Sequence, residues 1–135
     1  MKILATLFLI VLFSNTLFAQ KKGDNTVIVH GFVPYDRLKE VLFENGFVTI
    51  NSDTAFISTN GKAMGFVGDV SYILRKTDST LTLKGYAVAT LAGYSSGKTL
   101  IDNKGDKGSA NRVGFATMNK IANSFGLPVS YLKAN

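Results

Sequence analysis

Two stretches of the chain repeat apolar residues with the period of an amphipathic helix. The first starts at Pro34 and ends before Gly46, and Leu38, Val41 and Leu42 share one of its sides. Proline suits a first turn because its missing N–H would be unpaired there, and glycine suits the left-handed residue that ends a helix. The second covers residues 109–125, and its apolar stripe consists of Gly114, Phe115, Met118, Ile121, Ala122 and Phe125. The pattern therefore predicts two helices.

Runs of β-branched and aromatic residues predict five strands, at residues 26–31, 47–51, 55–59, 64–76 and 80–91. No helical period interrupts the last four strands, so we expect them to form an antiparallel meander. Along the fifth strand, an apolar face that includes Leu81 and Leu83 alternates with a mixed face that includes Lys84 and Tyr86. The alternation predicts a sheet with one apolar face and one open, mixed face.

The order of elements is β-α-β-β-β-β-α, an α+β fold in which one curved antiparallel sheet carries two helices on one face. Gly114 lies in the middle of the second apolar stripe, where glycine costs about 1 kcal/mol of helix propensity. We therefore expect the helix backbone to approach the sheet closely, against the small residues Gly85 and Ala87. The tail at residues 129–135 is expected to lie along the surface.

The element order resembles the fold of the TATA-box-binding protein half-repeat. It is also similar to small exported domains of unknown function from Bacteroidota, which open with a short β-branched strand ending in glycine, as Thr-Val-Ile-Val-His-Gly does at residues 26–31. The resemblance implies the fold alone. It carries over no catalytic residue, and DNA binding is not expected because fold does not fix function.

Residues 1–19 have the parts of a secretory signal peptide: Lys2, an apolar run at residues 3–13, and Ala19 before the predicted cut. The run is shorter than the roughly 20 apolar residues of a membrane-spanning helix, so cleavage is favoured over an uncleaved anchor. The ending, Phe-Ala-Gln followed by two lysines, resembles export signals of Bacteroidota. We therefore expect an exported protein, either periplasmic or secreted.

The rest of the 135-residue chain is predicted to be a flexible lead-in at residues 20–25 and a single α+β domain at residues 26–135. It has no cysteine, which excludes disulfides, thiol catalysis and thiolate metal sites. The net charge of +6 falls by one, to about +5, when Lys2 leaves with the signal peptide. Because the lysines are scattered, nucleic acid is not an expected partner. No metal, no cofactor and no membrane span after signal removal are expected, and the mature chain is predicted to be a monomer or weak homodimer.

Two catalytic patterns overlap near the loop at residues 93–108. Gly-Tyr-Ser-Ser-Gly matches the turn that exposes the nucleophile of serine hydrolases, with Ser95 in that place. Residues 92–99 approach a phosphate-binding loop, but Ala92 replaces its first glycine. Neither pattern is followed by the helix that each requires, and the single histidine, His30, precedes the serine instead of following it. We predict that both matches are accidental and that the protein is not an enzyme.

The mixed sheet face and the loop at residues 93–108 are the candidate contact surfaces, because apolar groups beside charges suit a protein interface. An ordinary solvated face is the alternative. The candidate contact residues are Ser71, Ile73, Arg75, Lys84, Tyr86, Val88, Tyr94 and Lys98. We expect a non-enzymatic binding or protein-interaction domain whose partner is a protein or an envelope component. The alternative function is a carrier of an apolar small molecule, with a pocket between helices and sheet.

Two three-residue motifs, beginning at Asp53 and at Asp78, fall at predicted turns. They resemble the Asp-[Ser/Thr]-X acceptor of protein O-glycosylation in Bacteroidota. The resemblance implies Thr54 and Ser79 as candidate attachment sites. The alternative is that these polar residues only form turns.

Overall fold

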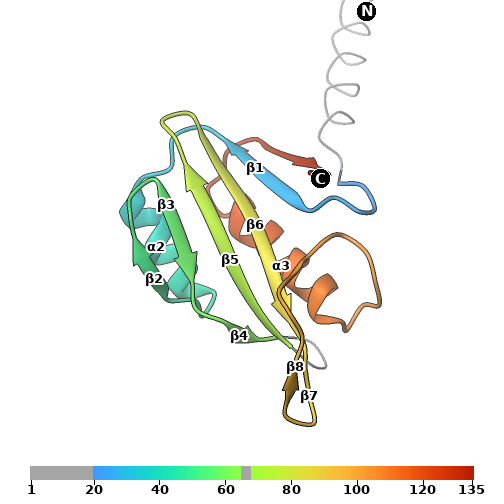
Figure 1. The fold of residues 1–135 in the computed structure, drawn as a ribbon. Helices are drawn as coiled ribbons and strands as arrows, with labels where there is room; N and C mark the ends of the chain where they lie inside the picture. The colour runs from blue at the N-terminus through green and yellow to red at the C-terminus, as the bar shows by residue number, and fades with distance from the viewer. Residues whose placement is uncertain (1–19, 65–67) are drawn as a thin grey trace, which may run out of the picture.

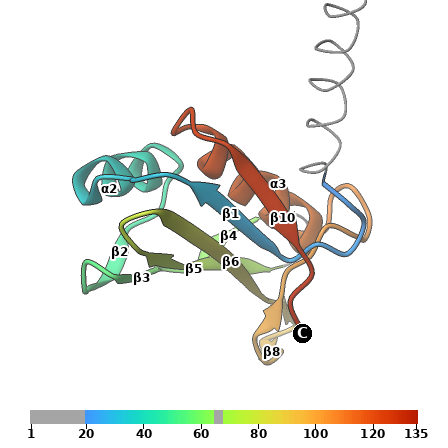
Figure 2. The same cartoon turned by 90° about the horizontal axis from the view of Figure 1, so that it is seen from above.

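The computed structural model describes residues 20–64 and 68–135, so the predicted signal peptide at residues 1–19 lies outside the described residues. The described chain forms an antiparallel sheet with two helices, α2 (Tyr35–Glu44) and α3 (Ala110–Asn123), on the same face (Figure 1). Figure 2 shows both helices on one side of the sheet and the opposite side open. The predicted α+β fold class is therefore confirmed.

The main sheet has the strand order β10-β1-β6-β5-β3-β2, and each neighbouring pair is antiparallel. These strands are β1 (Thr26–His30), β2 (Thr49–Ser52), β3 (Phe56–Thr59), β5 (Asp69–Lys76), β6 (Thr80–Val88) and β10 (Val129–Leu132). Two short strands add to it, because β4 (Lys62–Ala63) pairs with β5 and β9 (Thr99–Leu100) pairs with β6. A separate hairpin of β7 (Thr90–Leu91) and β8 (Tyr94–Ser95) continues beyond β6 (Figure 1).

The predicted meander is present, with two differences in its long strands. The strand predicted at residues 64–76 begins at Asp69, and residues 65–67 lie outside the described chain. The strand predicted at residues 80–91 divides at Ala89 into β6 and β7. The loop predicted at residues 93–108 contains the short strands β8 and β9, so part of it pairs with the sheet.

The predicted element order lacks a strand that the C-terminal tail forms. Val129–Leu132 does not simply follow the surface, because it forms strand β10 along β1. Four residues after Pro128 are too short a pattern to predict a strand alone. The backbone groups on the outer side of β1 supply the reason for pairing, since they would otherwise form an open sheet edge.

The side chains of β5 and β6 alternate between the two faces as predicted. The buried face contains Val70, Tyr72, Leu74, Leu81, Leu83 and Gly85. The buried residues of the helices cover it: Leu38, Val41 and Leu42 from α2, and Gly114, Phe115, Met118, Ile121 and Ala122 from α3. Together the two helices and the inner face of the sheet form one continuous hydrophobic core.

Gly114 approaches the sheet closely, but its neighbours differ from the predicted ones. A Cβ atom at Gly114 would lie 3.0 Å from Val70 Cγ2 and 3.1 Å from Ile101 Cδ1. A Cβ atom at Gly85 would lie only 2.3 Å from the same Ile101 Cδ1. Ile101 therefore lies between the two glycines, and the expected direct packing of Gly114 on Gly85 and Ala87 is wrong. The physical reason is that Ile101, directly after β9, packs its side chain into the core although the loop that follows it is polar.

The end of the predicted flexible lead-in is bonded to the folded domain. Gly23 N donates to Asn103 O at 3.2 Å, and Asn103 N donates to Asp24 O at 2.7 Å. The Asn25 side chain donates to Ala134 O at 2.8 Å and accepts from Ala134 N at 2.9 Å. Residues 23–25 are also buried. This part of the lead-in therefore belongs to the domain and holds the C-terminal segment beside β1.

Replacing Asn25 by alanine is expected to lower the free energy of unfolding by about 1–3 kcal/mol, because the buried Thr26 hydroxyl and two half-buried backbone groups of Ala134 would lose their partner. The Asn25 side chain bonds both backbone groups of Ala134 and accepts from Thr26 Oγ1 at 3.0 Å. Urea unfolding would measure the loss, and amide hydrogen exchange should accelerate first at Ala134. The exposed Asn135 gives a matched control, since Asn135→Ala should change the free energy by less than about 0.5 kcal/mol. Equal effects of both substitutions would contradict the proposed role of Asn25.

Candidate functional site

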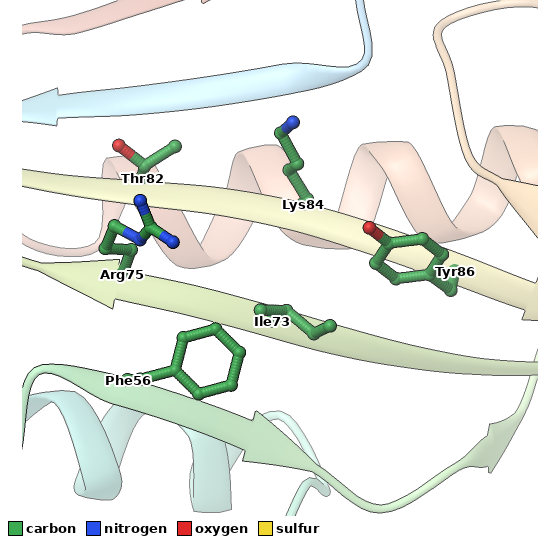
Figure 3. Close-up of a pocket in the computed structure, with 6 residues that line it drawn as sticks. All are labelled: Phe56, Ile73, Arg75, Thr82, Lys84 and Tyr86. Atoms are coloured by element: carbon green, nitrogen blue, oxygen red, sulfur yellow. The ribbon is translucent and has the colours of Figure 1, made fainter. Parts of the chain in front are cut away.

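The open face of the sheet carries a solvent-accessible hollow of about 500 Å³. Its lining consists of Phe56, Ile73, Arg75, Thr82, Lys84 and Tyr86. Figure 3 shows these six side chains on the same side of β3, β5 and β6, with the helix on the far side of the strands. The hollow is therefore formed by the central strands and is not covered by either helix.

The register of the strands brings these side chains together. Arg75 in β5 lies opposite Thr82 in β6 and opposite Phe56 in β3. Two residues earlier in β5, Ile73 lies opposite Lys84. Residues directly opposite each other in an antiparallel pair point to the same face, so three strands contribute to one surface. The buried partners on the other face, Leu74 and Leu83, fix this register because a one-residue slip would expose them.

The lining combines apolar and cationic groups. Phe56, Ile73 and Tyr86 are half-buried and form the apolar part, while Arg75 is exposed and Lys84 is half-buried. Within the described chain, the ion pairs are Arg37 with Glu40 and Lys104 with Asp102, so neither hollow cation has a carboxylate partner. Within β5 the one acid is Asp69, six residues from Arg75, or about 20 Å along the strand. Asp78 is closer in the chain, three residues after Arg75, but it lies exposed in the turn that follows β5 and forms no ion pair among the described residues.

The structure brings four of the eight predicted contact residues into the hollow: Ile73, Arg75, Lys84 and Tyr86. Ser71 and Val88 are on the same face but further along the strands, opposite Tyr86 and Asp69 respectively. Tyr94 and Lys98 are elsewhere, on and after the hairpin that projects from the end of the sheet (Figure 1). Tyr94 is 83% exposed. The two predicted surfaces are thus separate.

Phe56 is the lining residue that the sequence prediction missed. Thr82 alternates with Leu81 and Leu83 and so belongs to the predicted mixed face, although it was not among the candidate contact residues. No face was assigned to the third strand. The signal was the alternation of Phe56 and Ser58 with Ile57, which is fully buried. That alternation gives the face of Phe56, whereas its position beside Arg75 requires the pairing of β3 with β5.

The serine and histidine of the hydrolase-like pattern are far apart. Ser95 lies in β8 after the end of β6, and its Oγ is 3.3 Å from Thr90 Oγ1. His30 is opposite Thr80 at the start of β6, with its Nε2 2.6 Å from Ser130 Oγ. Strand β6 separates these positions by about 25 Å. Ser95 and His30 therefore do not form a nucleophile–base pair.

Around Gly114, in the middle of α3, the space between the helix and the sheet is filled by core side chains. Ile101 and Tyr72 are both fully buried, and Tyr72 Oη donates to Gly114 O at 2.7 Å. Tyr72 also meets the ring of Phe47 edge-on, with centroids 4.8 Å apart. This packing gives no support to a pocket for an apolar ligand at that position.

Both candidate glycosylation residues lie in exposed turns. Thr54 is in the turn between β2 and β3, and Ser79 is in the turn between β5 and β6. The backbone N–H of Ala55 donates to Asp53 Oδ1 at 3.0 Å, which is the hydrogen bond that defines an Asx turn. Both hydroxyl-bearing residues are accessible to a modifying enzyme, and modification itself stays a prediction.

Over residues 20–64 and 68–135, no group of three or more His, Asp or Glu side chains is placed to hold a metal ion. The helices in that part of the chain are too short or too polar to cross a membrane. Comparisons of the chain with models of protein families, with curated proteins and with solved structures find no match.

Proposed function

We propose that the protein is an exported, non-enzymatic binding module that receives a protein partner on the open face of its sheet. The observation that carries the proposal is the hollow of about 500 Å³ on the face that no helix covers. The signal-peptide pattern at residues 1–19 supports export.

The composition of the hollow supports binding over simple solvation. Phe56, Ile73 and Tyr86 are adjacent large apolar groups, whereas a solvated sheet face usually carries apolar residues singly. Arg75 and Lys84 provide polar contacts around them. An apolar centre with arginine and tyrosine is typical of the residues that contribute most to protein interfaces.

Photo-crosslinking in the native host cells tests this proposal. The photoreactive residue benzoylphenylalanine would replace Ser71, which lies on the open face opposite Tyr86 and outside the lining of the hollow. We expect a covalent adduct with a partner protein at this position, identified by mass spectrometry. Placing the same residue at Ala116, which is exposed on α3, gives the matched control and should yield no adduct.

A second variant connects the adduct to the hollow. Adding Ile73→Asp to the Ser71 crosslinking protein should abolish the adduct, because a carboxylate would replace an apolar group at the centre of the lining. Circular dichroism would establish that this variant is folded. Adducts at Ala116 alone, or adducts at Ser71 that survive Ile73→Asp in a folded protein, would contradict binding at the open face.

A further inference from the structure

We infer that the partner presents an acidic peptide segment to the hollow, with a carboxylate held by Arg75 and Lys84 and a neighbouring apolar side chain on Phe56, Ile73 and Tyr86. This inference rests on the proposed function and adds the chemistry of the partner. Its basis is the pairing of two cations with an apolar surface on an uncovered face.

The two cations are close together without an intramolecular anion. Lys84 is two residues from Thr82, the residue directly opposite Arg75, so Arg75 and Lys84 are diagonal neighbours about 7–8 Å apart at their Cα atoms. Two positive side chains on neighbouring positions of one face repel each other. A carboxylate between them removes that repulsion, and guanidinium can bind it through two parallel hydrogen bonds.

Other cations on neighbouring strands and turns already have internal contacts. Lys76 Nζ lies 4.5 Å from the centre of the Phe32 ring, and Lys62 Nζ donates to Asn45 O at 2.8 Å. In helix α2, Arg37 is likewise paired, with Glu40 at 2.7 Å. Arg75 and Lys84 make no comparable contact among the described residues, which leaves both available to an external anion.

Two hydroxyl groups extend the polar side of the hollow. Thr82 and Tyr86 line it, and within the described chain neither hydroxyl takes part in a hydrogen bond. Hydroxyl groups can donate to carboxylate oxygens or accept from a peptide N–H. Together with the two cations, these hydroxyl groups offer more hydrogen-bond donors than one carboxylate requires. The remaining groups can bond the backbone of a peptide that carries the carboxylate.

The depth of the apolar groups favours a peptide over a membrane surface. The strongly exposed large apolar residues, such as Phe43 and Tyr94, lie outside the hollow, whereas Phe56, Ile73 and Tyr86 are half-buried within it. A flat bilayer cannot reach the bottom of a hollow, but a side chain projecting from an extended segment can. The net charge of the mature chain, the +6 of the full chain less Lys2 or about +5, also accelerates the approach of an acidic partner.

Selection of a phage-displayed random dodecapeptide library on the mature protein tests the inference. We expect enrichment of peptides in which aspartate or glutamate adjoins a large apolar residue. Charge reversal by Arg75→Glu with Lys84→Glu should weaken binding of a synthesised, enriched peptide at least tenfold. The matched control reverses Arg112 and Lys120 on the exposed side of α3, which changes the net charge equally and should leave the affinity within about twofold.

Amide chemical shifts of the isotope-labelled protein would locate the bound peptide, with the largest changes expected at Ile73, Lys84 and Tyr86. Neutral or basic peptides that shift these residues would overturn the acidic inference and leave the proposed function standing. Acidic peptides that bind both charge-reversal proteins equally would also overturn it. If no peptide shifts the open face, both the inference and the proposed function fail. Binding of phosphatidylglycerol vesicles in place of peptides, lost on Arg75→Glu with Lys84→Glu, would assign the cations to a membrane surface instead.

Discussion

Replacing Ile101 by alanine is expected to lower the free energy of unfolding by about 2–5 kcal/mol. Ile101 is fully buried, and its Cδ1 atom occupies the space between Gly85 and Gly114. Neither glycine has a side chain that could expand into the cavity left behind. The loss should therefore lie in the upper part of this range, and it can be measured by urea unfolding of the mature protein.

The complementary substitution, Gly85→Ala, is expected to cost about 1–3 kcal/mol through overpacking. The new Cβ atom would lie 2.3 Å from Ile101 Cδ1, 2.6 Å from Ile101 Cγ1 and 3.0 Å from Tyr72 Cε1. Alanine at position 101 removes the first two of these atoms. The double variant should consequently be more stable than the sum of the single effects predicts, with a coupling free energy of about 1–2 kcal/mol.

Two substitutions elsewhere in the chain provide controls. Gly97 has no atom within 4 Å of its Cβ position, so Gly97→Ala should have little effect. Ile50 is 69% exposed, so Ile50→Ala should change the free energy by less than about 0.5 kcal/mol. Additive effects at positions 85 and 101 would contradict the packing of Ile101 against Gly85.

Local patterns in the sequence were sufficient for most elements of the fold. Five of the six residues of the predicted stripe, Gly114, Phe115, Met118, Ile121 and Ala122, are buried in α3, whereas Phe125 is half-buried after the helix, which ends at Asn123. Gly46 has the positive φ angle, 83°, expected of the residue that ends the first helix. The alternation in β5 and β6 separated Leu74 and Leu83 from the open face. These features depend on neighbours within a few residues, so they are visible in a single sequence.

The features that sequence patterns missed depend on distant neighbours. β10 forms because β1 has an unpaired edge, and β1 precedes it by about a hundred residues. Leu100 and Ile101 form only a two-residue apolar step before a polar loop, and the role of Ile101 appears only when the glycines of β6 and α3 come together around it. Neither pairing leaves a periodic signal in its own segment.

For the candidate site too, local patterns were predictable from the sequence and contacts between distant segments were not. Alternation placed Ile73, Arg75, Lys84 and Tyr86 on one face, and the structure brings them into one hollow. Phe56 was missed because its position beside Arg75 depends on the register between β3 and β5. Such a register is set by the whole core, so the composition of the face was predictable and the outline of the hollow was not.

Alkaline pH is expected to destabilise the protein through Tyr72. Burial raises the pKa of the Tyr72 hydroxyl well above its ordinary value of 10.0, and this exceeds the opposing effect of a hydrogen bond with the Thr117 side chain. In the unfolded chain the phenol ionises near pH 10, whereas the buried phenol stays neutral because a charge in the core is unfavourable. The stabilisation is therefore complete below about pH 10 and is lost as the pH rises toward the folded-state pKa.

The free energy of unfolding should fall by about 1.4 kcal/mol per pH unit above pH 10 from this residue alone. Tyr72→Phe removes the titrating group, so its stability should depend less steeply on pH than that of the wild type. At neutral pH the same variant should be about 1 kcal/mol less stable, because Gly114 O loses the hydroxyl donor at 2.7 Å. The two stability curves should consequently converge or cross at high pH.

Urea unfolding between pH 8 and pH 11.5 distinguishes this behaviour from general alkaline effects. Tyr94→Phe is the matched control, since Tyr94 is 83% exposed and its loss should leave the wild-type slope unchanged. If Tyr72→Phe and the wild type show equal slopes above pH 10, ionisation of the buried phenol does not control alkaline stability. A shallower slope in Tyr72→Phe alone would connect the alkaline limit of the fold to the contact between β5 and α3, because Tyr72 lies in β5 and its hydroxyl bonds to Gly114 in α3.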